Sequence, residues 1–147
     1  MTIFNSFNIS ASGMSAQRLR MDIISNNLAN ANTTRTAEGG AYRRQIAVFG
    51  ERNTPVAFGD ILAQAMNQNS GNGVRVLRVA QDQSPLKMVY NPDHPDANGE
   101  GYVAMPNVNV VTEMVDMISA SRSYEANVTA VNAAKSMAMK ALEIGRG

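Results

Sequence analysis

The chain of 147 residues contains no cysteine and no tryptophan, and only 5% of its residues are aromatic. Without cysteine, the chain can form no disulfide, no thiol nucleophile and no thiolate zinc site. The net charge of +1 is too small to argue for binding to nucleic acid or to an anionic membrane surface. Composition therefore excludes disulfide-stabilised proteins, thiol enzymes and thiolate zinc proteins. It gives no support to binding of nucleic acid or of a membrane surface.

Long apolar runs are also missing from the sequence. No stretch approaches the ~18 consecutive apolar residues of a membrane span. Met1–Gly13 carries neither lysine nor arginine and has no continuous apolar core, so it does not resemble a cleaved signal peptide. The sequence thus predicts a soluble chain with no direct membrane span that does not use the general secretory route.

The segment Val110–Leu142 has a strong helical periodicity. No glycine or proline lies between Asn107 and Gly145, so nothing in the backbone chemistry interrupts a helix there. A rod of roughly 50 Å, at about 1.5 Å per residue, needs another helix along it, because propensity alone does not stabilise it. Its apolar positions follow the heptad repeat of a coiled coil. This predicted seam consists of Val110, Met114, Met117, Ser121, Tyr124, Val128, Val131, Lys135, Ala138 and Leu142.

The segment Phe4–Ala31 is the predicted partner helix. It has two apolar faces on nearly opposite sides, and a helix of this kind is covered on two sides. We expect one face to pair with the C-terminal helix and the other to contact a second subunit. The alternative is a plain helical hairpin whose second faces cover the middle of the chain.

Residues can be assigned to these two roles, although the assignments could be exchanged between faces. The predicted helix pairing within the chain uses Met14, Met21, Ile24, Leu28, Met117, Tyr124, Val128 and Val131. The predicted contact between subunits uses Leu19, Ile23, Ala130, Ala134 and Met137, among which the alanines permit close approach.

The middle of the chain changes from helical to strand-like periodicity. Turn-rich segments separate the short strand candidates, which are Ala41–Phe49, Gly73–Ala80, Leu86–Tyr90 and Gly101–Met105. Phe58–Met66 is apolar enough for a turn of helix or a docked loop.

The predicted fold is therefore mainly α with a small β element. Residues 1–34 and 106–147 form long terminal helices paired as a coiled coil. Residues 35–105 form a β-rich, loop-rich outer region with a flexible loop near residues 51–73.

Candidates for chemistry are few. His94 is the only histidine, and with Asp93 and Asp96 it falls short of a metal-binding constellation, so a solvated turn is the better interpretation. Arg43 and Arg44 are adjacent strand residues that point to opposite faces, which argues against a nucleic-acid site. We find no base and orienting group beside a nucleophile, and we expect no catalytic site, no cofactor and no metal.

Three segments carry a family resemblance. Ser12–Thr34 (SGMSAQRLRMDIISNNLANANTT) resembles the N-terminal signature of the bacterial flagellar axial proteins, which form rod, hook and hook-associated structures. Arg35–Phe49 and Pro106–Gly145 are similar to the rod proteins of that family. Glu51–Gly73 matches no part of it.

The resemblance implies a structural subunit of the proximal rod of the flagellar basal body, with no enzymatic activity. It implies terminal helices that line a tube around the export channel, and a drive shaft that transmits motor torque. Expected partners are copies of the chain, other rod proteins and the flagellar type III export apparatus. The expected location is the rod where it crosses the periplasmic space, reached without a cleaved signal peptide.

Two other interpretations remain at this stage. The chain could be a neighbouring flagellar axial protein, although its middle region is far shorter than that of hook proteins. It could also be a soluble helical-hairpin adaptor that binds one partner as a discrete complex. An adaptor would have a defined mass in solution, whereas a rod subunit would polymerise or co-assemble.

Overall fold

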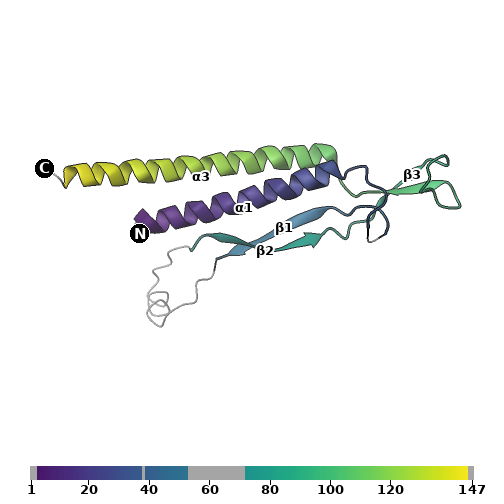
Figure 1. Cartoon of the computed structure of the whole chain (residues 1–147), viewed down its shortest axis with the longest axis horizontal. Coiled ribbons are helices and arrows are strands. Elements are labelled where there is room, and N and C mark those ends of the chain that lie inside the picture. The colour runs from purple at the N-terminus through teal and green to yellow at the C-terminus, as the bar shows by residue number, and fades with distance from the viewer. Residues whose placement is uncertain (1–2, 38, 53–71, 146–147) are drawn as a thin grey trace, which may run out of the picture. The chain divides into compact units, whose positions relative to one another are not determined.

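The computed structural model describes residues 3–37, 39–52 and 72–145. The described chain contains two long helices and four short strands (Figure 1). In chain order the elements are α1 (Ile3–Ala29), β1 (Gln45–Glu51), β2 (Val74–Gln81), β3 (Lys87–Tyr90), β4 (Tyr102–Met105) and α3 (Val110–Ile144).

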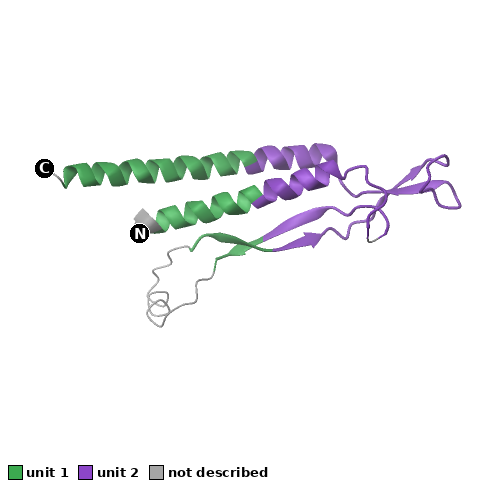
Figure 2. Cartoon of the chain, viewed as in Figure 1, with its two compact units in different colours: residues 1–18, 49–77, 121–147 green, residues 19–48, 78–120 purple. Residues whose placement is uncertain are grey.

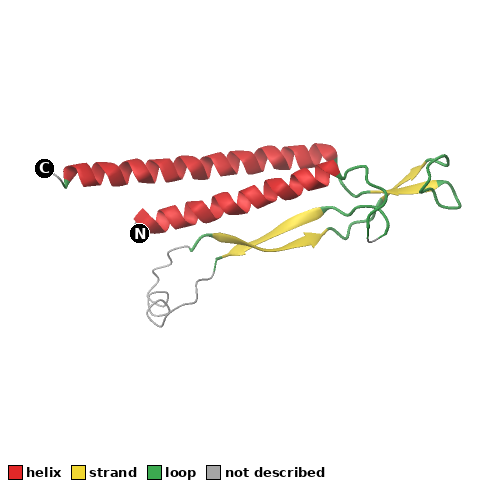
Figure 3. Ribbon diagram, viewed as in Figure 1, coloured by secondary structure: helices red, strands yellow, loops and turns green. Residues whose placement is uncertain are grey.

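The structure confirms the predicted secondary structure. Both long helices are present, and α3 is uninterrupted over 35 residues. All four predicted strands are present, although β1 begins at Gln45 rather than at Ala41. The expected helical turn or docked loop at Phe58–Met66 lies outside the described residues. The fold is thus two long helices with a small β region between them in the sequence (Figure 3).

The chain divides into two compact units (Figure 2). The first unit comprises residues 1–18, 49–77 and 121–147, and the second comprises residues 19–48 and 78–120. Each unit contains part of α1 and part of α3. The division into paired terminal helices and an outer β-rich region remains a prediction.

In the second unit, α1 and α3 run antiparallel, because Arg20 and Asn27 of α1 bond Asp116 and Glu113 of α3 respectively. The buried apolar side chains here are Ile23, Ile24, Val103 and Ala120.

The start of α3 and the β3–β4 pair lie in the same unit. Asn109 caps α3, since its side-chain oxygen accepts from the backbone N–H groups of Val111 and Thr112. Strands β3 and β4 pair antiparallel. At the end of this pair the rings of Tyr90 and Tyr102 meet edge to face, with centroids 5.3 Å apart.

In the first unit, small side chains allow α1 and α3 to approach closely. Ala16 of α1 and Ala134 of α3 are buried. A Cβ atom placed on Gly13 would lie 2.8 Å from Oδ1 of Asn127 and 3.1 Å from its Cγ, so the glycine leaves room for the Asn127 side chain. The absence of a side chain at Gly13 is therefore a packing requirement in the middle of a helix.

Helix α1 also holds the start of β2 in the first unit. The Ser12 hydroxyl donates to the carbonyl of Ile9 and accepts from the backbone N–H of Val74 at 3.0 Å. Gly73 has a φ of +89°, and a Cβ atom there would collide with the Ser12 side chain. The backbone N–H of Arg52 donates to the carbonyl of Gly73 and closes the base of the β1–β2 pair.

Replacing Gly13 by leucine tests the close approach of the helices. Leucine favours helix by roughly 1 kcal/mol over glycine, yet we expect Gly13→Leu to destabilise the chain by about 1–3 kcal/mol because it overpacks the contact with Asn127. The matched control is Ala11→Leu on the exposed side of α1, which should be neutral or slightly stabilising. Urea unfolding followed by circular dichroism measures both. Equal stability of the two variants would contradict the close contact.

Candidate assembly surface and buried polar network

Asn27, in the last turns of α1, is the most completely bonded side chain of the second unit. It is 1% exposed. Its Nδ2 donates to the carbonyl of Gln45 at 2.8 Å and to Oε2 of Glu113 at 3.0 Å. Its Oδ1 accepts from the backbone N–H of Gln45 and from the hydroxyl of Tyr42. Both amide protons and both lone pairs of the oxygen are used, so these bonds offset the cost of removing the amide from water.

Glu113, in the first turns of α3, is fully buried and paired with Arg44. The Arg44 Nε donates to Glu113 Oε1 at 2.6 Å, while Asn27 donates to the other carboxylate oxygen. A carboxylate without such partners would cost several kcal/mol to bury. The positive end of the α3 dipole adds to its stabilisation. Glu113 therefore ties α3 to both α1 and the segment that leads into β1.

Arg44 connects further carboxylates at the edge of this network. Its guanidinium lies 3.4 Å from Asp116, which Arg20 also contacts at 2.9 Å. It also lies 3.8 Å from Asp82. The pKa of Asp82 is lowered first by the hydroxyl and backbone N–H of Ser84 and then by Arg44 and Arg43. Asn27, Tyr42, Arg44, Glu113 and Asp116 are called the polar network below.

Tyr42 closes the network on one side. Burial raises the pKa of its hydroxyl above the ordinary value of 10.0, and the negative charge of Glu113 raises that pKa further. The neutral hydroxyl therefore stays a donor to Asn27 over the whole physiological range of pH.

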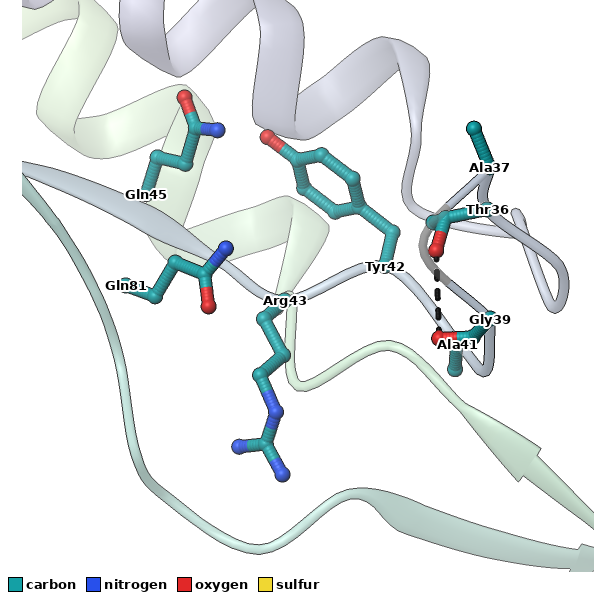
Figure 4. Close-up of a pocket in the computed structure, with 8 residues that line it drawn as sticks. All are labelled: Thr36, Ala37, Gly39, Ala41, Tyr42, Arg43, Gln45 and Gln81. Atoms are coloured by element: carbon teal, nitrogen blue, oxygen red, sulfur yellow. Dashed lines mark hydrogen bonds between the residues drawn. The ribbon is translucent and has the colours of Figure 1, made fainter.

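A hollow of about 420 Å³ lies beside Tyr42 (Figure 4). Figure 4 shows Tyr42 and Arg43 pointing away from one another, as neighbouring residues of an extended segment do. Arg43 donates to the backbone carbonyls of Asp82 and Ser84, each at 3.4 Å. The hollow is lined by Thr36, Ala37, Gly39, Ala41, Tyr42, Arg43, Gln45 and Gln81, a set with no nucleophile–base pair.

The first turns of α3 present a contiguous apolar surface to solvent. At 100° per residue, these positions fall on one side of the helix, and the middle of the set points away from buried Glu113 and Ala120. Val111 is 71% exposed and Ile118 is 56% exposed. We call this set the α3 apolar face; it consists of Val110, Val111, Met114, Val115 and Ile118.

Further along α3 the same side of the helix becomes polar, at Arg122, Glu125 and Thr129. In the first unit the end of α3 again exposes large apolar side chains, namely Met137, Met139, Leu142 and Ile144. A second hollow, of about 350 Å³, adjoins the α3 apolar face in the second unit, between the end of α1, strand β3 and the start of α3.

The residues predicted for helix pairing fall at different depths. Ile24 is buried, and Leu28 is at the edge of exposure. The others are half-buried, namely Met14, Met21, Met117, Tyr124, Val128 and Val131.

The residues predicted for contact between subunits divide into buried and exposed side chains. Ile23 and Ala134 are buried within their own units, and Ala134 is only 6% exposed. Met137 is 63% exposed, and Leu19 and Ala130 are also exposed.

The buried line of α3 differs from the predicted seam towards both ends of the helix. The side chains of Val110, Met114, Lys135 and Leu142 are exposed, although all four belong to the predicted seam. Buried side chains occur instead one residue earlier, at Glu113, Ala120 and Ala134. A paired carboxylate and two small side chains occupy the inner face, and larger apolar side chains face outward.

Sequence reasoning missed the polar network. Asn27 has no predicted role, and Arg44 enters the sequence-based predictions only in the argument against a nucleic-acid site. The available signal was the placement of Glu113 and Asp116 in an otherwise apolar stretch of helix. Arg44, two residues after Tyr42, supplies the positive charge that these two acidic residues would need as a partner.

Neither metal nor membrane chemistry is visible in the described part of the chain. Over residues 3–37, 39–52 and 72–145, no group of three or more histidine, aspartate or glutamate side chains is placed to hold a metal ion. His94 Nδ1 accepts from the backbone N–H of Asp96. Neither described helix is long and apolar enough to cross a membrane.

Comparisons with known proteins agree along the whole chain. Residues 7–35 match the family described as flagella basal body rod protein, and residues 100–144 match the C-terminal family of flagellar basal body rod FlgEFG proteins. The flagellar basal-body rod protein FlgC of Borreliella burgdorferi is 51% identical over 152 residues, covering 100% of both chains. That of Bacillus subtilis is 51% identical and covers 99% of this chain and 100% of its own length. That of Escherichia coli O157:H7 is 41% identical with the same coverage.

Removing the cation from the polar network should unfold the chain more easily. Arg44→Ala leaves the buried Glu113 carboxylate with Asn27 alone, and breaking a buried ion pair in this way costs about 3–5 kcal/mol. The matched control is Arg43→Ala, which loses only two long hydrogen bonds to carbonyls and should cost about 1 kcal/mol or less. Urea unfolding measures both, and similar losses in the two variants would contradict the special role of Arg44.

The two causes of the Tyr42 shift can be separated by titration. Glu113→Gln removes the charge, so the pKa of Tyr42 should fall but stay above 10.0, because burial is the larger cause. Since the folded-state pKa is raised, the stability contributed by neutral Tyr42 is complete below pH 10.0 and is lost as the pH rises through the folded value. NMR of ¹³C-labelled tyrosine measures the pKa. A value at or below 10.0 in the variant would refute this order of causes.

Proposed function

The chain belongs to the FlgC family of flagellar basal-body rod proteins and is a structural subunit of that rod; from this we propose that it assembles with copies of itself and with other rod proteins into the proximal part of the tubular drive shaft. In this proposal the tube transmits motor torque and encloses the export channel. The protein performs this work through contacts between subunits and not through a reaction.

The exposed apolar surface of α3 is the observation that carries the proposal. A side chain such as Ile118 gains about 1.5–3 kcal/mol when it moves from water into an apolar contact. A monomer that leaves several such side chains together on one helix face exposes a surface typical of protein contacts. Two separate apolar surfaces on one chain suit a heterologous contact, which repeats into a tube or helix instead of closing as a dimer.

Helix pairing within the subunit and contact between subunits take different residues in this proposal. The terminal helices pair as a coiled coil through the half-buried positions Met117, Tyr124, Val128 and Val131 of α3. Leu19, Ala130 and Met137 keep the predicted role of contacting neighbouring subunits, because they are exposed in the chain. Ile23 and Ala134 are already covered within their own units and are left to the subunit's own packing.

The route and location follow from the same proposal. The chain leaves the cytoplasm through the flagellar type III export apparatus without a cleaved signal peptide and adds to the rod where it crosses the periplasmic space. The lack of cysteine supports this route, because a chain without thiols cannot become trapped by a disulfide in an oxidising compartment.

A charge on the α3 apolar face should block assembly. Ile118→Lys removes an apolar contact and introduces a charge, so we expect at least a roughly tenfold loss of the chain from purified basal bodies and a loss of swimming, since about 1.4 kcal/mol is tenfold in affinity. The matched control is Thr129→Lys, which adds the same charge on the polar continuation of that helix side and should swim normally.

Three measurements decide this experiment: swimming in soft agar, the amount of the chain in basal bodies, and its level in cells. Normal incorporation of Ile118→Lys would remove the α3 apolar face from the subunit contact. A fall in the cellular level of both lysine variants alike would mean that charge on α3 damages the subunit itself.

A further inference from the structure

In the second unit, the contact between α1 and α3 combines apolar side chains with one buried polar group. Ile23, Ile24 and Ala120 are aliphatic and form no directional contact with a partner. Glu113 differs, because its two carboxylate oxygens are bonded by Asn27 and by Arg44. Polar bonds of this kind tolerate only one alignment of the two helices, whereas aliphatic contacts tolerate several.

The sequence of α3 offers an alternative alignment of α3 along α1, which the chain must avoid. Glu113 and Ala120 are one heptad apart, lie on the same side of α3, and are both 0% exposed. A slide of α3 by one heptad along α1 would replace one by the other opposite Asn27. On this side of α3, Tyr124 would take the place of Met117, and Asn127 would take that of Ala120. Asn27 would lose an acceptor, and the Glu113 carboxylate would lose both donors.

We propose that the bonds of Glu113 to Asn27 and Arg44 select the axial register of α1 and α3. Asn27 and Arg44 are held in place independently of α3: Asn27 by the backbone of Gln45, and Arg44 through its carbonyl by the backbone N–H of Asp82. They form a fixed socket, and Glu113 is the one side chain of α3 that fills it. Asp116 adds ion pairs to Arg20 and Arg44, but all three side chains are part-exposed, so water weakens their share in the choice.

The short connection between β4 and α3 is the competing explanation. Pro106 is buried, and Asn107 accepts from the backbone N–H of Arg44 and donates to the carbonyl of Asp82. If this connection alone sets the register of α1 and α3, replacing Glu113 leaves the register unchanged. The two explanations differ in what happens when Glu113 is replaced by an apolar side chain.

Pulsed electron paramagnetic resonance on the full chain distinguishes them. Because the chain has no cysteine, spin labels placed at Ser25→Cys in α1 and Ile118→Cys in α3 are the only labels present. The unmodified network should give one narrow distance. In Glu113→Leu we expect a second population, displaced along the helix axis by about 10 Å, the length of one heptad.

Two controls separate register from stability. Glu113→Gln keeps one acceptor oxygen, which can still accept from Arg44 or from Asn27, and it should keep the single distance. Ile24→Ala creates a cavity at a buried apolar site and costs about 2–5 kcal/mol, but it should also keep the single distance because the network is intact. A second population in Ile24→Ala would show general loosening and overturn the proposal.

A further variant guards against loss of folding. Arg44→Met with Glu113→Leu replaces both charges, a change that often leaves stability unaltered, and it should show the same two populations. A single unchanged distance in the apolar variants would assign the register to residues 106–109. A broad distance in the parent chain, or failure of both variants to fold, would also overturn the proposal. None of these outcomes depends on assembly into a rod, so the proposed function is tested separately.

Discussion

The buried Glu113 carboxylate is the constraint on which the second unit depends. An ionised group away from water must be paired, or it costs several kcal/mol. Its partners come from α1, through Asn27, and from the segment before β1, through Arg44. Three parts of the chain distant in sequence must therefore be in place together. The aliphatic contacts of Ile23, Ile24 and Ala120 add stability without this requirement, because apolar burial depends on area and not on direction.

The long helices could be predicted because their signal is local. An uninterrupted run without glycine or proline and a repeating apolar face are enough to predict α3. The side of α3 that lies inside could not be predicted in the same way. Hydrophobicity alone places Val110 and Met114 inwards, whereas the structure buries Glu113 and Ala120. Along this part of α3 the larger apolar side chains are exposed, whereas the buried positions hold a paired carboxylate and an alanine.

The polar network shows a second limit of sequence reasoning. Four asparagines near the end of α1 look alike in the sequence, yet Asn27 alone among them is buried. Its role depends on Tyr42, Gln45 and Glu113, the last of which is 86 residues away in the chain. No local pattern contains that information. The family, by contrast, was recognised from sequence motifs, and the comparisons confirm it, since matching motifs requires no knowledge of which side chains meet.

The backbone bond between Arg52 and Gly73 joins the chain directly after β1 to the chain directly before β2. Gly73 adopts a left-handed backbone conformation with a positive φ. The backbone N–H of the next residue, Val74, donates to the hydroxyl of Ser12 in α1. The start of β2 is thus fixed both to the end of β1 and to α1.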